Sequence, residues 1–397
     1  MKITAVETLR LGEFPNIIWV LIRTDEGLTG LGETFMDAGA VEAHVHDTLA
    51  PRLIGRDPLQ IEAINRDLIT YLGWRGAGAE TRACSAIDIA LWDIFAQSMG
   101  QPLAVALGGR SRDSIRTYNT CAGYRYVRDA RAQAVANWGR GAGGGPYEDL
   151  DAFMTDAGEL AQSLLAQGIT GMKIWPFDPA AERTHGLDIS ADELRAALRP
   201  FEQIRAAVGD AMDVMVEFHS LWRLPAARRI ARALQPFDTF WHEDPVRMDS
   251  LDALKLYAED CPTLICASET LAYPHAFRDY LATGVAGVCM LDLSWCGGVS
   301  EARKIAALAE AHQIPVAPHD CTGPVVWMAS CHFSLHARGA IIQESVRAFY
   351  TGWYRELVTD LPVVANGQIT VGDAPGLGLT LLPGLENRAD AIHRIAR

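Results

Sequence analysis

The sequence predicts an α/β protein in which a closed barrel of parallel strands follows a smaller α+β unit. Three observations lead to this prediction. The first hundred residues hold three β-type runs and one long helical pattern, whereas from about Arg116 short β-rich runs alternate with longer amphipathic helices. Eight such runs follow one another, which favours a closed barrel over an open sheet. A length of 397 residues suits two domains, or one barrel with extra elements.

The N-terminal unit is predicted from its alternating runs. Residues 4–11 and 17–24 are β-type segments, and a third run ends near Glu33 after an Asp-Glu-Gly turn. Helical patterning is clearest over residues 81–99, which end before a glycine and a proline, as a helix should. The last thirty residues are rich in glycine and predict a meandering return rather than another βα unit.

The barrel strands are predicted where short β-rich runs precede amphipathic segments. Helix starts support the count, because Ser190 and Glu193 form a capping box and Ser300 is expected to open a helix over residues 301–312. The eight predicted strands are residues 116–121, 171–175, 213–218, 239–243, 263–268, 287–293, 315–318 and 340–344.

A glycine-rich segment, residues 138–146, contains the pattern GxGxxG at Gly139, Gly141 and Gly144. A dinucleotide-binding turn requires a strand directly before this pattern and a helix directly after it. Here a helical pattern over residues 127–137 precedes it and Pro146 follows it. The segment is therefore interpreted as a mobile loop after the first barrel strand.

The composition argues against several classes of partner. With 35 Lys and Arg against 49 Asp and Glu, the net charge is −14, which disfavours nucleic acid and anionic membranes. No apolar stretch approaches the roughly 18 residues of a membrane span, and the N-terminus lacks a signal-peptide core. The eight cysteines form no CxxC pair and are interpreted as reduced core residues, which favours a cytoplasmic location.

Three consecutive predicted strands end in a glutamate. Glu217, Glu243 and Glu269 follow one another at intervals of 26 residues, one βα unit each, at the rim where barrels place functional groups. Carboxylates held together repel unless a cation lies between them, and oxygen ligands select Mg²⁺, Mn²⁺ or Ca²⁺. The alternative, in which each glutamate pairs with an arginine, suits one glutamate better than three at matched positions. We expect the three to hold Mg²⁺.

The next strands supply a base. Asp292 and His319 lie 27 residues apart at the ends of the sixth and seventh strands. The aspartate can hold the imidazole in one tautomer and stabilise its protonated form. A lone histidine at a strand end more often has a structural role than a catalytic one. The presence of Asp292 one βα unit before His319 favours the catalytic role. Glu344 ends the eighth strand, where it could hydrogen-bond an enolised intermediate or orient the substrate.

Two further polar groups are expected on the inner faces of earlier strands. Residues i and i+2 share a strand face, so His219 faces the same way as Glu217, and Trp175 the same way as Lys173. Lys173 could offset the charge of a substrate carboxylate, and His219 could protonate a leaving group. A cap on the next helix is the alternative role for His219. His242 should face the helix layer and is predicted to be structural.

These residues together predict metal-assisted removal of a proton next to a carboxylate. General acid–base catalysis contributes roughly 10²–10⁴ per group, which is too little when a second negative charge develops beside a carboxylate. A divalent ion adds several kcal/mol of charge stabilisation.

The residues resemble the enolase superfamily, specifically its mandelate racemase branch. The resemblance rests on residues 83–109 (ACSAIDIALWDIFAQSMGQPLAVALGG), on the spacing from Glu217 to Glu344 and on residues 372–379 (GDAPGLGL). It implies an α+β capping domain over residues 1–114 and a modified TIM-like (β/α)7β barrel over residues 115–365. Residues 366–397 would then return to the capping domain. It also implies one Mg²⁺ and, as is common among relatives, a homo-oligomer.

Within this branch the sequence is similar to acid-sugar dehydratases of the galactonate and mannonate type. That resemblance implies a small carboxylate substrate, an aldonate or an aldarate. His319 would take the α-proton, Mg²⁺ and Glu344 would stabilise the enolised acid, and His219 would protonate the departing hydroxyl. The product would be a 2-keto-3-deoxy acid.

Two departures from the family pattern bear on the reaction. Glu217 stands where much of the family has Asp. The second strand reads Lys173-Ile-Trp175 where many relatives have Lys-x-Lys, which removes a base on the opposite face and disfavours racemisation. An insertion near residues 176–187 is expected to shape the pocket. Candidate substrate contacts are Trp175, Trp222, Arg223 and the loops at residues 12–16 and 73–80.

Three alternatives stay open at this point. An epimerase or lactone cycloisomerase of the same superfamily would exchange or invert the α-centre without loss of water. A non-catalytic acid-binding or regulatory protein would keep the metal site and show no turnover. The third alternative is a barrel hydrolase, which is disfavoured because no HxH pattern follows the first barrel strand.

Overall fold

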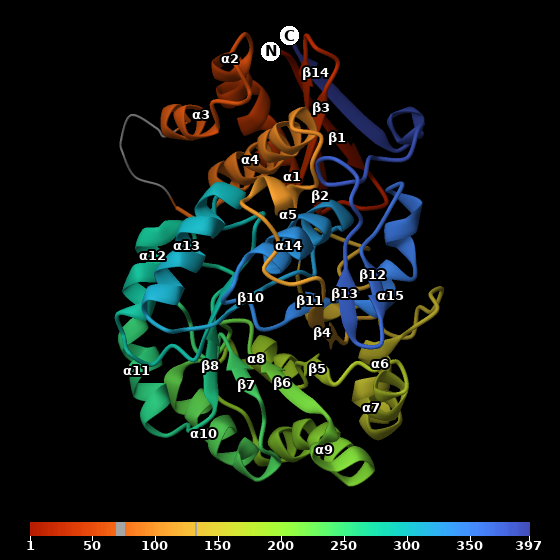
Figure 1. Cartoon of the computed structure of the whole chain (residues 1–397). Helices are drawn as coiled ribbons and strands as arrows, with labels where there is room; N and C mark the ends of the chain where they lie inside the picture. The colour runs from red at the N-terminus through yellow and green to blue at the C-terminus, as the bar shows by residue number, and fades with distance from the viewer. Residues whose placement is uncertain (69–75, 132) are drawn as a thin grey trace.

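Strands from both ends of the chain meet in one antiparallel sheet. The computed structural model describes residues 1–68, 76–131 and 133–397. Its first sheet has the order β14-β1-β2-β3, from β14 (Ala391–Ala396), β1 (Ile3–Leu11), β2 (Ile17–Thr24) and β3 (Thr29–Phe35). The three predicted N-terminal runs are therefore strands, and the C-terminal end of the chain returns to the first of them (Figure 1).

The longest helix of this part packs directly on the sheet. Helix α4 (Ala79–Ser98) lies against β3, where a Cβ on Gly32 would come within 1.8 Å of the Ala86 carbonyl oxygen. A Cβ on Gly30 would come within 2.0 Å of the Ala90 carbonyl oxygen, so the close approach requires glycine at both positions. The other helical segments here are α1 (Ala38–His44), a π-helical turn (Val45–Leu49), α2 (Ala50–Leu53), α3 (Ile61–Asp67) and α5 (Leu103–Ala106).

Among the described residues, eight parallel strands form the barrel. Strands β4 to β10 pair in sequence order, and β11 pairs with β4. Between β10 and β11 a single bridge joins Val316 and Ala340, and the Ile341 amide donates to the Val316 carbonyl oxygen at 3.0 Å. The strands are β4 (Ile115–Thr120), β5 (Gly171–Ile174), β6 (Asp213–Glu217), β7 (Trp241–Glu243), β8 (Leu264–Ala267), β9 (Val288–Leu291), β10 (Val316–Pro318) and β11 (Gln343–Ser345).

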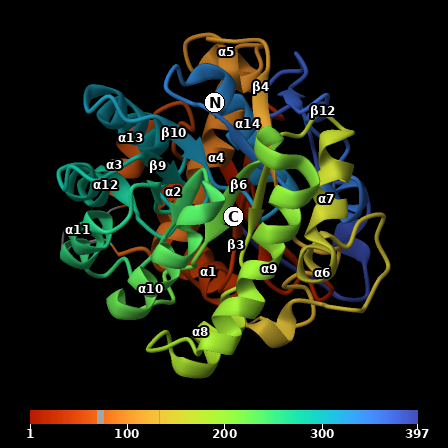
Figure 2. The ribbon, with the colours of Figure 1, turned by 90° about the horizontal axis from the view of Figure 1, so that it is seen from below.

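Helices surround these strands, as the view along the barrel shows (Figure 2). In the described residues, each of the first seven barrel strands is followed by one or two α-helices. After β11 come the short α15 (Arg347–Tyr350), the hairpin of β12 (Val363–Ala365) and β13 (Gln368–Thr370), two 3-10 segments and β14. This is the modified (β/α)7β barrel that the resemblance implies. The outer helices are α6 (Asp149–Thr155), α7 (Ala157–Leu165), α8 (Asp178–Thr184), α9 (Ala191–Val208), α10 (Leu224–Leu234), α11 (Leu251–Glu259), α12 (Tyr273–Leu281), α13 (Val299–Ala311) and α14 (Pro324–His336).

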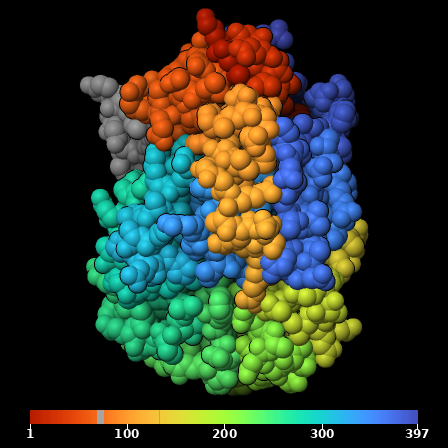
Figure 3. Space-filling model, viewed as in Figure 1, coloured from red at the N-terminus to blue at the C-terminus, as the bar shows by residue number. Residues whose placement is uncertain are grey.

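Bulky side chains fill the barrel. Tyr118, Met215, Trp241 and Met290 form a separate buried cluster among the strands, so the interior is packed and cannot serve as a channel. The space-filling view shows residues of the N-terminal part, in orange, running down over the cyan and blue barrel atoms (Figure 3). Among the helices of the described residues, none combines the length and apolar character that a membrane crossing needs. The eight cysteines, all within the described ranges, form no disulfide.

Two local predictions are wrong. Residues 127–131 and 133–137 form turns and one short 3-10 segment (Val135–Asn137) instead of the predicted helix, because side chains satisfy the backbone: Asn137 Oδ1 accepts from the amides of Asp129 and Ala130. Ser300 does not open a helix. Gly298 caps α13, and the Ser300 hydroxyl donates to Asp88 of α4.

Two other local predictions are confirmed. Ser190 and Glu193 form the expected capping box of α9. The glycine-rich segment is irregular and is preceded by a 3-10 segment rather than a strand, so the dinucleotide interpretation lacks the context it requires, while the mobility expected of this loop stays a prediction.

Candidate active site

Three carboxylates converge at the C-terminal rim of the barrel. Glu217 and Glu243 end β6 and β7 and are register partners, and Glu269 follows β8 by two residues. One oxygen of each lies within 4.8 Å of the others, and all three side chains are buried. The 26-residue spacing therefore brings these residues together, as the sequence predicts.

The cluster carries more negative charge than its neighbours balance. The Lys173 ammonium lies 2.6 Å from Glu243 Oε1 and 3.2 Å from Glu217 Oε2, yet Glu217 Oε2 accepts no hydrogen bond. Burial, and then the Glu217 carboxylate, raise the pKa of Glu243 well above its usual value. A buried oxygen without a donor and an uncompensated carboxylate are what a hard divalent cation satisfies, so the donor set fits Mg²⁺.

A histidine–aspartate pair adjoins this cluster. Asp292 follows β9 and His319 follows β10, and the imidazole Nδ1 lies 2.7 Å from Asp292 Oδ2. Asp292 Oδ1 accepts from the Ser294 amide and hydroxyl, which fixes the carboxylate. The other imidazole nitrogen, Nε2, lies 3.0 Å from Glu269 Oε2. Burial lowers the pKa of His319, but Glu269 and Glu344 outweigh it and raise that pKa well above its usual value.

Glu344 lies behind the cavity wall. Its Oε1 accepts from the Thr120 hydroxyl and lies 3.1 Å from Lys173 Nζ, and its Oε2 accepts from the Asp320 amide at 2.7 Å. The side chain is fully buried, whereas Lys173 and Thr120 line the cavity. The structure thus places Lys173 at the wall, with Glu344 holding it from the rear.

A second histidine–aspartate pair lies on the other side of the cluster. His219 has a left-handed backbone (φ 51°), its amide donates to Glu217 Oε1, and its Nδ1 lies 2.7 Å from Asp178 Oδ2. Burial lowers the pKa of His219, but Asp178 and Glu217 outweigh it and raise that pKa to about 9. Because Arg223 is the cap residue of α10, the alternative role of His219 as a helix cap is wrong.

Asp178 is a functional candidate that sequence reasoning missed. It opens α8, the extra helix within the predicted insertion, and is buried. The only sequence signal is a carboxylate three residues beyond Trp175, where no repeat spacing marks it. The insertion therefore supplies a partner for His219 as well as part of the wall.

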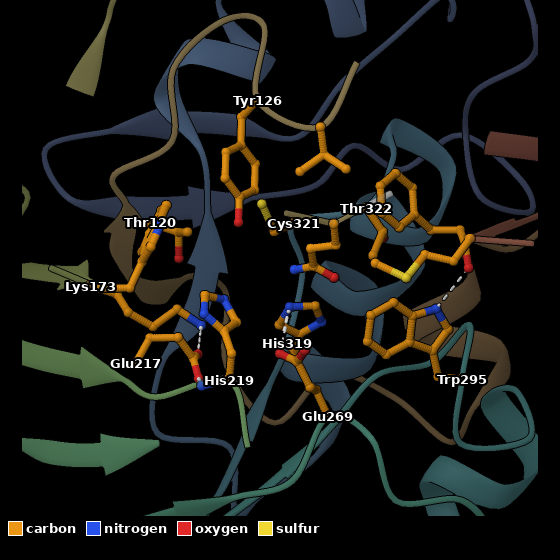
Figure 4. A pocket seen from close by; sticks show the side chains of 15 residues that line it. Thr120, Tyr126, Lys173, Glu217, His219, Glu269, Trp295, His319, Cys321 and Thr322 are labelled. Atoms are coloured by element: carbon orange, nitrogen blue, oxygen red, sulfur yellow. Dashed lines mark hydrogen bonds and ion pairs between the residues drawn. The ribbon is translucent and has the colours of Figure 1, made fainter. Parts of the chain in front are cut away.

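Several of these groups line two adjoining cavities that share Tyr126, His219, Glu269 and Trp295. The narrow inner cavity is bordered by Lys173, Glu217 and His319 (Figure 4), and the outer cavity has a volume of about 540 Å³. Its volume lies in the range of small-molecule sites. Lining residues that sequence reasoning missed are Arg82, Thr120, Tyr126, Gln133, Trp295 and Cys321.

The expected substrate contacts divide into two groups. Trp175 lines the inner cavity, with its ring 5.9 Å from that of His219. Trp222 is fully buried and Arg223 is exposed, and neither lines the cavity. The loop at 12–16 does not line the cavity. Its Asn16 side chain donates to the carbonyls of Val127 and Ala130, and so supports the segment that carries the lining residue Tyr126. Of the loop at 73–80, residues 73–75 lie outside the described residues.

His242 faces the helix layer, as predicted. Its ring nitrogens contact the Thr239 and Tyr257 hydroxyls at 2.9 and 2.7 Å. It is buried and does not line the cavity.

Comparison with known proteins places this geometry in a family. Residues 156–384 match the family described as enolase C-terminal domain-like, and residues 4–108 match the mandelate racemase / muconate lactonizing enzyme N-terminal domain. The D-galactonate dehydratase of Xanthomonas axonopodis pv. citri (strain 306) is 29% identical over 400 residues, covering 98% of this chain and 94% of that protein. The D-xylonate dehydratase of Haloferax volcanii is 29% identical over 390 residues, covering 96% and 87%.

A solved structure agrees with these matches. An enolase of the mandelate racemase subgroup from Agrobacterium tumefaciens is 56% identical to this chain and covers 100% of it, with 99% of its own length matched and a TM-score of 0.89. Both domains of the family model, the relatives and the barrel-rim carboxylates lead to the same assignment. The chain belongs to the enolase superfamily, in its mandelate racemase branch.

Proposed function

We propose that the protein is a Mg²⁺-dependent acid-sugar dehydratase. It removes the proton next to the carboxylate of a sugar acid and expels the β-hydroxyl as water, giving a 2-keto-3-deoxy acid. The observation that carries the proposal is the pair of imidazoles, His319 and His219, that line one cavity beside three carboxylates. The names of the galactonate and xylonate dehydratase relatives support the same reaction class.

His319 is the base in this proposal. Asp292 holds the Nδ1 side of the ring at 2.7 Å, so Nε2, which lies 3.0 Å from Glu269 Oε2, is the nitrogen left to take the proton. A cation held by Glu269 would offset the charge that raises the pKa of His319, so the ring could be neutral and accept the proton. A Mg²⁺ ion held by Glu217, Glu243 and Glu269 would stabilise the negative charge that develops on the substrate carboxylate. Lys173, at the inner wall, adds a fixed positive charge next to the same place.

His219 is the acid. Its raised pKa keeps the ring protonated at neutral pH, because Asp178 and Glu217 stabilise the imidazolium against burial. A protonated imidazole can donate to the leaving hydroxyl, whereas Trp175 occupies the position of the second lysine of the Lys-x-Lys pattern and cannot accept or return a proton. This arrangement favours elimination over inversion of the α-centre.

Asp178→Asn should lower kcat about 10–100-fold with little change in KM. The amide keeps the size of the side chain but removes the charge that holds and stabilises the His219 imidazolium, so protonation of the leaving group slows. Steady-state kinetics of 2-keto acid formation measure the effect. Asp188→Asn, an exposed position after the same helix, is the matched control and should behave as wild type. Equal losses in both variants would contradict the role of Asp178.

A screen of aldonates and aldarates tests the proposed function. The purified protein with Mg²⁺ should form a 2-keto acid from at least one of them, and EDTA should stop the reaction. Exchange or inversion of the α-proton in D₂O without loss of water would instead identify an isomerising enzyme. Ligand-dependent melting shifts with no turnover across the panel would identify a binding protein.

A further inference from the structure

An arginine from the N-terminal part lines the outer cavity. Arg82 lies in the first turn of α4, opposite the barrel residues that line the same space, and its side chain is only 15% exposed. Its guanidinium lies 5.1 Å from the ring centre of Trp295, and that ring lies 5.3 Å from the ring of His319. Arg82 is therefore separated from the proposed base by one indole ring.

The hydrogen-bonding capacity of Arg82 is only partly used. Nη1 contacts Asp37 Oδ2 at 3.2 Å, and that aspartate is 66% exposed, so this pair is a weak surface contact. Nε is buried and has no hydrogen-bond partner. Burial lowers the pKa of Arg82 and outweighs the carboxylates around it, of which Asp37 has the largest effect. A buried donor of a charged group without a partner is costly unless a ligand completes it.

The other charged groups at this end are already paired. Arg247 also lines the outer cavity, but its Nε and Nη2 both donate to Asp249, and the side chain is about half exposed. Of the three acidic residues lining it, Glu182 accepts from the Val135 amide, Glu269 contacts His319 and Asp178 contacts His219. Among the described residues that line this cavity, Arg82 is thus the cation whose buried donor, Nε, has no hydrogen-bond partner in the protein.

We propose that Arg82 binds the second carboxylate of a dicarboxylic sugar acid, so that the enzyme prefers aldarates over the corresponding aldonates. This rests on the proposed function, in which the first carboxylate lies at the carboxylate cluster. The Arg82 guanidinium lies 5.1 Å from the Trp295 ring, and that ring lies 5.3 Å from the His319 ring, so the sum of these two distances is the upper limit for the separation of Arg82 from His319. The carbon chain of a five- or six-carbon diacid can span such a separation. A planar guanidinium matches a carboxylate better than it matches a terminal hydroxymethyl group.

The test compares acids that differ only at the far end. Stereochemically matched pairs of aldonate and aldarate are titrated calorimetrically into the Mg²⁺-loaded protein, and kcat/KM is measured for each acid that turns over. The aldarate should bind about 10–100-fold more tightly in wild type. Arg82→Met, which keeps an apolar stem over Trp295, should remove this preference chiefly through Kd and KM and leave the aldonate values within about threefold. Arg82→Lys should retain part of the preference.

Arg303→Met is the matched control. Arg303 lies over Trp92 at 5.2 Å on α13, outside the cavity, so its loss removes an arginine–indole contact without touching the proposed subsite. An equal fall for both acids in Arg82→Met would overturn the inference, as would a wild-type preference for the aldonate or for an aldonate phosphate. Arg82-dependent binding of the diacid without any 2-keto acid would leave the inference standing and refute the proposed function alone.

Discussion

His319→Asn should reduce 2-keto acid formation by about 10³–10⁴-fold, with a melting temperature close to that of wild type. The carboxamide cannot accept the α-proton, and general base catalysis by a positioned group contributes up to about 10⁴. The side chain stays near Asp292, which holds Nδ1 in the wild type at 2.7 Å, so the fold should persist. The measurement is the single-turnover rate with the acid that the screen identifies.

His336→Asn is the matched control for loss of a histidine. This half-buried residue at the end of α14 contacts the Gly109 carbonyl at 2.9 Å and lies outside the cavity. It should retain wild-type turnover. An undiminished rate in His319→Asn would show that another group is the base.

Removal of the divalent ion, or of one of its proposed ligands, should have an effect of similar size. EDTA should stop turnover, and added Mg²⁺ should restore it. Glu243→Gln should weaken Mg²⁺ binding at least about 100-fold. Mutating a residue that only hydrogen-bonds a metal ligand already lowers metal affinity about 10–100-fold, and Glu243 is proposed to be a ligand itself. Isothermal titration of Mg²⁺ into the metal-free protein measures the loss, with the exposed Glu202→Gln on α9 as control.

Thermal melting gives an independent readout of the same site. Mg²⁺ at 100 times its Kd stabilises a protein by about 2.7 kcal/mol if only the folded state binds it. Wild type should therefore melt at a higher temperature with Mg²⁺, and Glu243→Gln should not. Without Mg²⁺, Glu243→Gln should be more stable than wild type, by a margin that grows as the pH rises above about 4.5, the ordinary pKa of a glutamate. Burial raises the pKa of Glu243, so its ionisation costs stability as the pH rises, and the neutral amide avoids this cost. An unchanged Mg²⁺ response in Glu243→Gln would contradict the site.

The repeat geometry made most of the site predictable. One βα unit occupies about the same number of residues each time, so the equal spacing of Glu217, Glu243 and Glu269 predicts that their side chains meet. In the structure, one oxygen of each lies within 4.8 Å of the others. Asp292 and His319 follow by the same rule and form a hydrogen bond. Parallel strands of a barrel end at one rim, which is why strand-end residues can be placed without coordinates.

What the sequence could not reveal depends on contacts between distant segments. Asp178 lies on an inserted helix outside the repeat, and only the fold brings it to 2.7 Å from His219. Ser300 carries a typical capping side chain, yet Asp88 on α4 takes its hydroxyl as a hydrogen-bond donor. The segment predicted as a helix before the glycine-rich loop is held in turns by Asn16 and Asn137. At Ser300 and in the segment before the glycine-rich loop, side-chain hydrogen bonds override the local preference.

Solvent exchange at the α-carbon tests most directly whether the two histidines divide the reaction as proposed. The active acid is incubated in D₂O with Mg²⁺ and either His219→Asn or His319→Asn, and the α-proton and product signals are followed by NMR. Asparagine suits the left-handed backbone at 219 (φ 51°). We expect His219→Asn to exchange the α-proton while forming little 2-keto acid, and His319→Asn to do neither. Exchange that continues without the His319 imidazole would contradict the account.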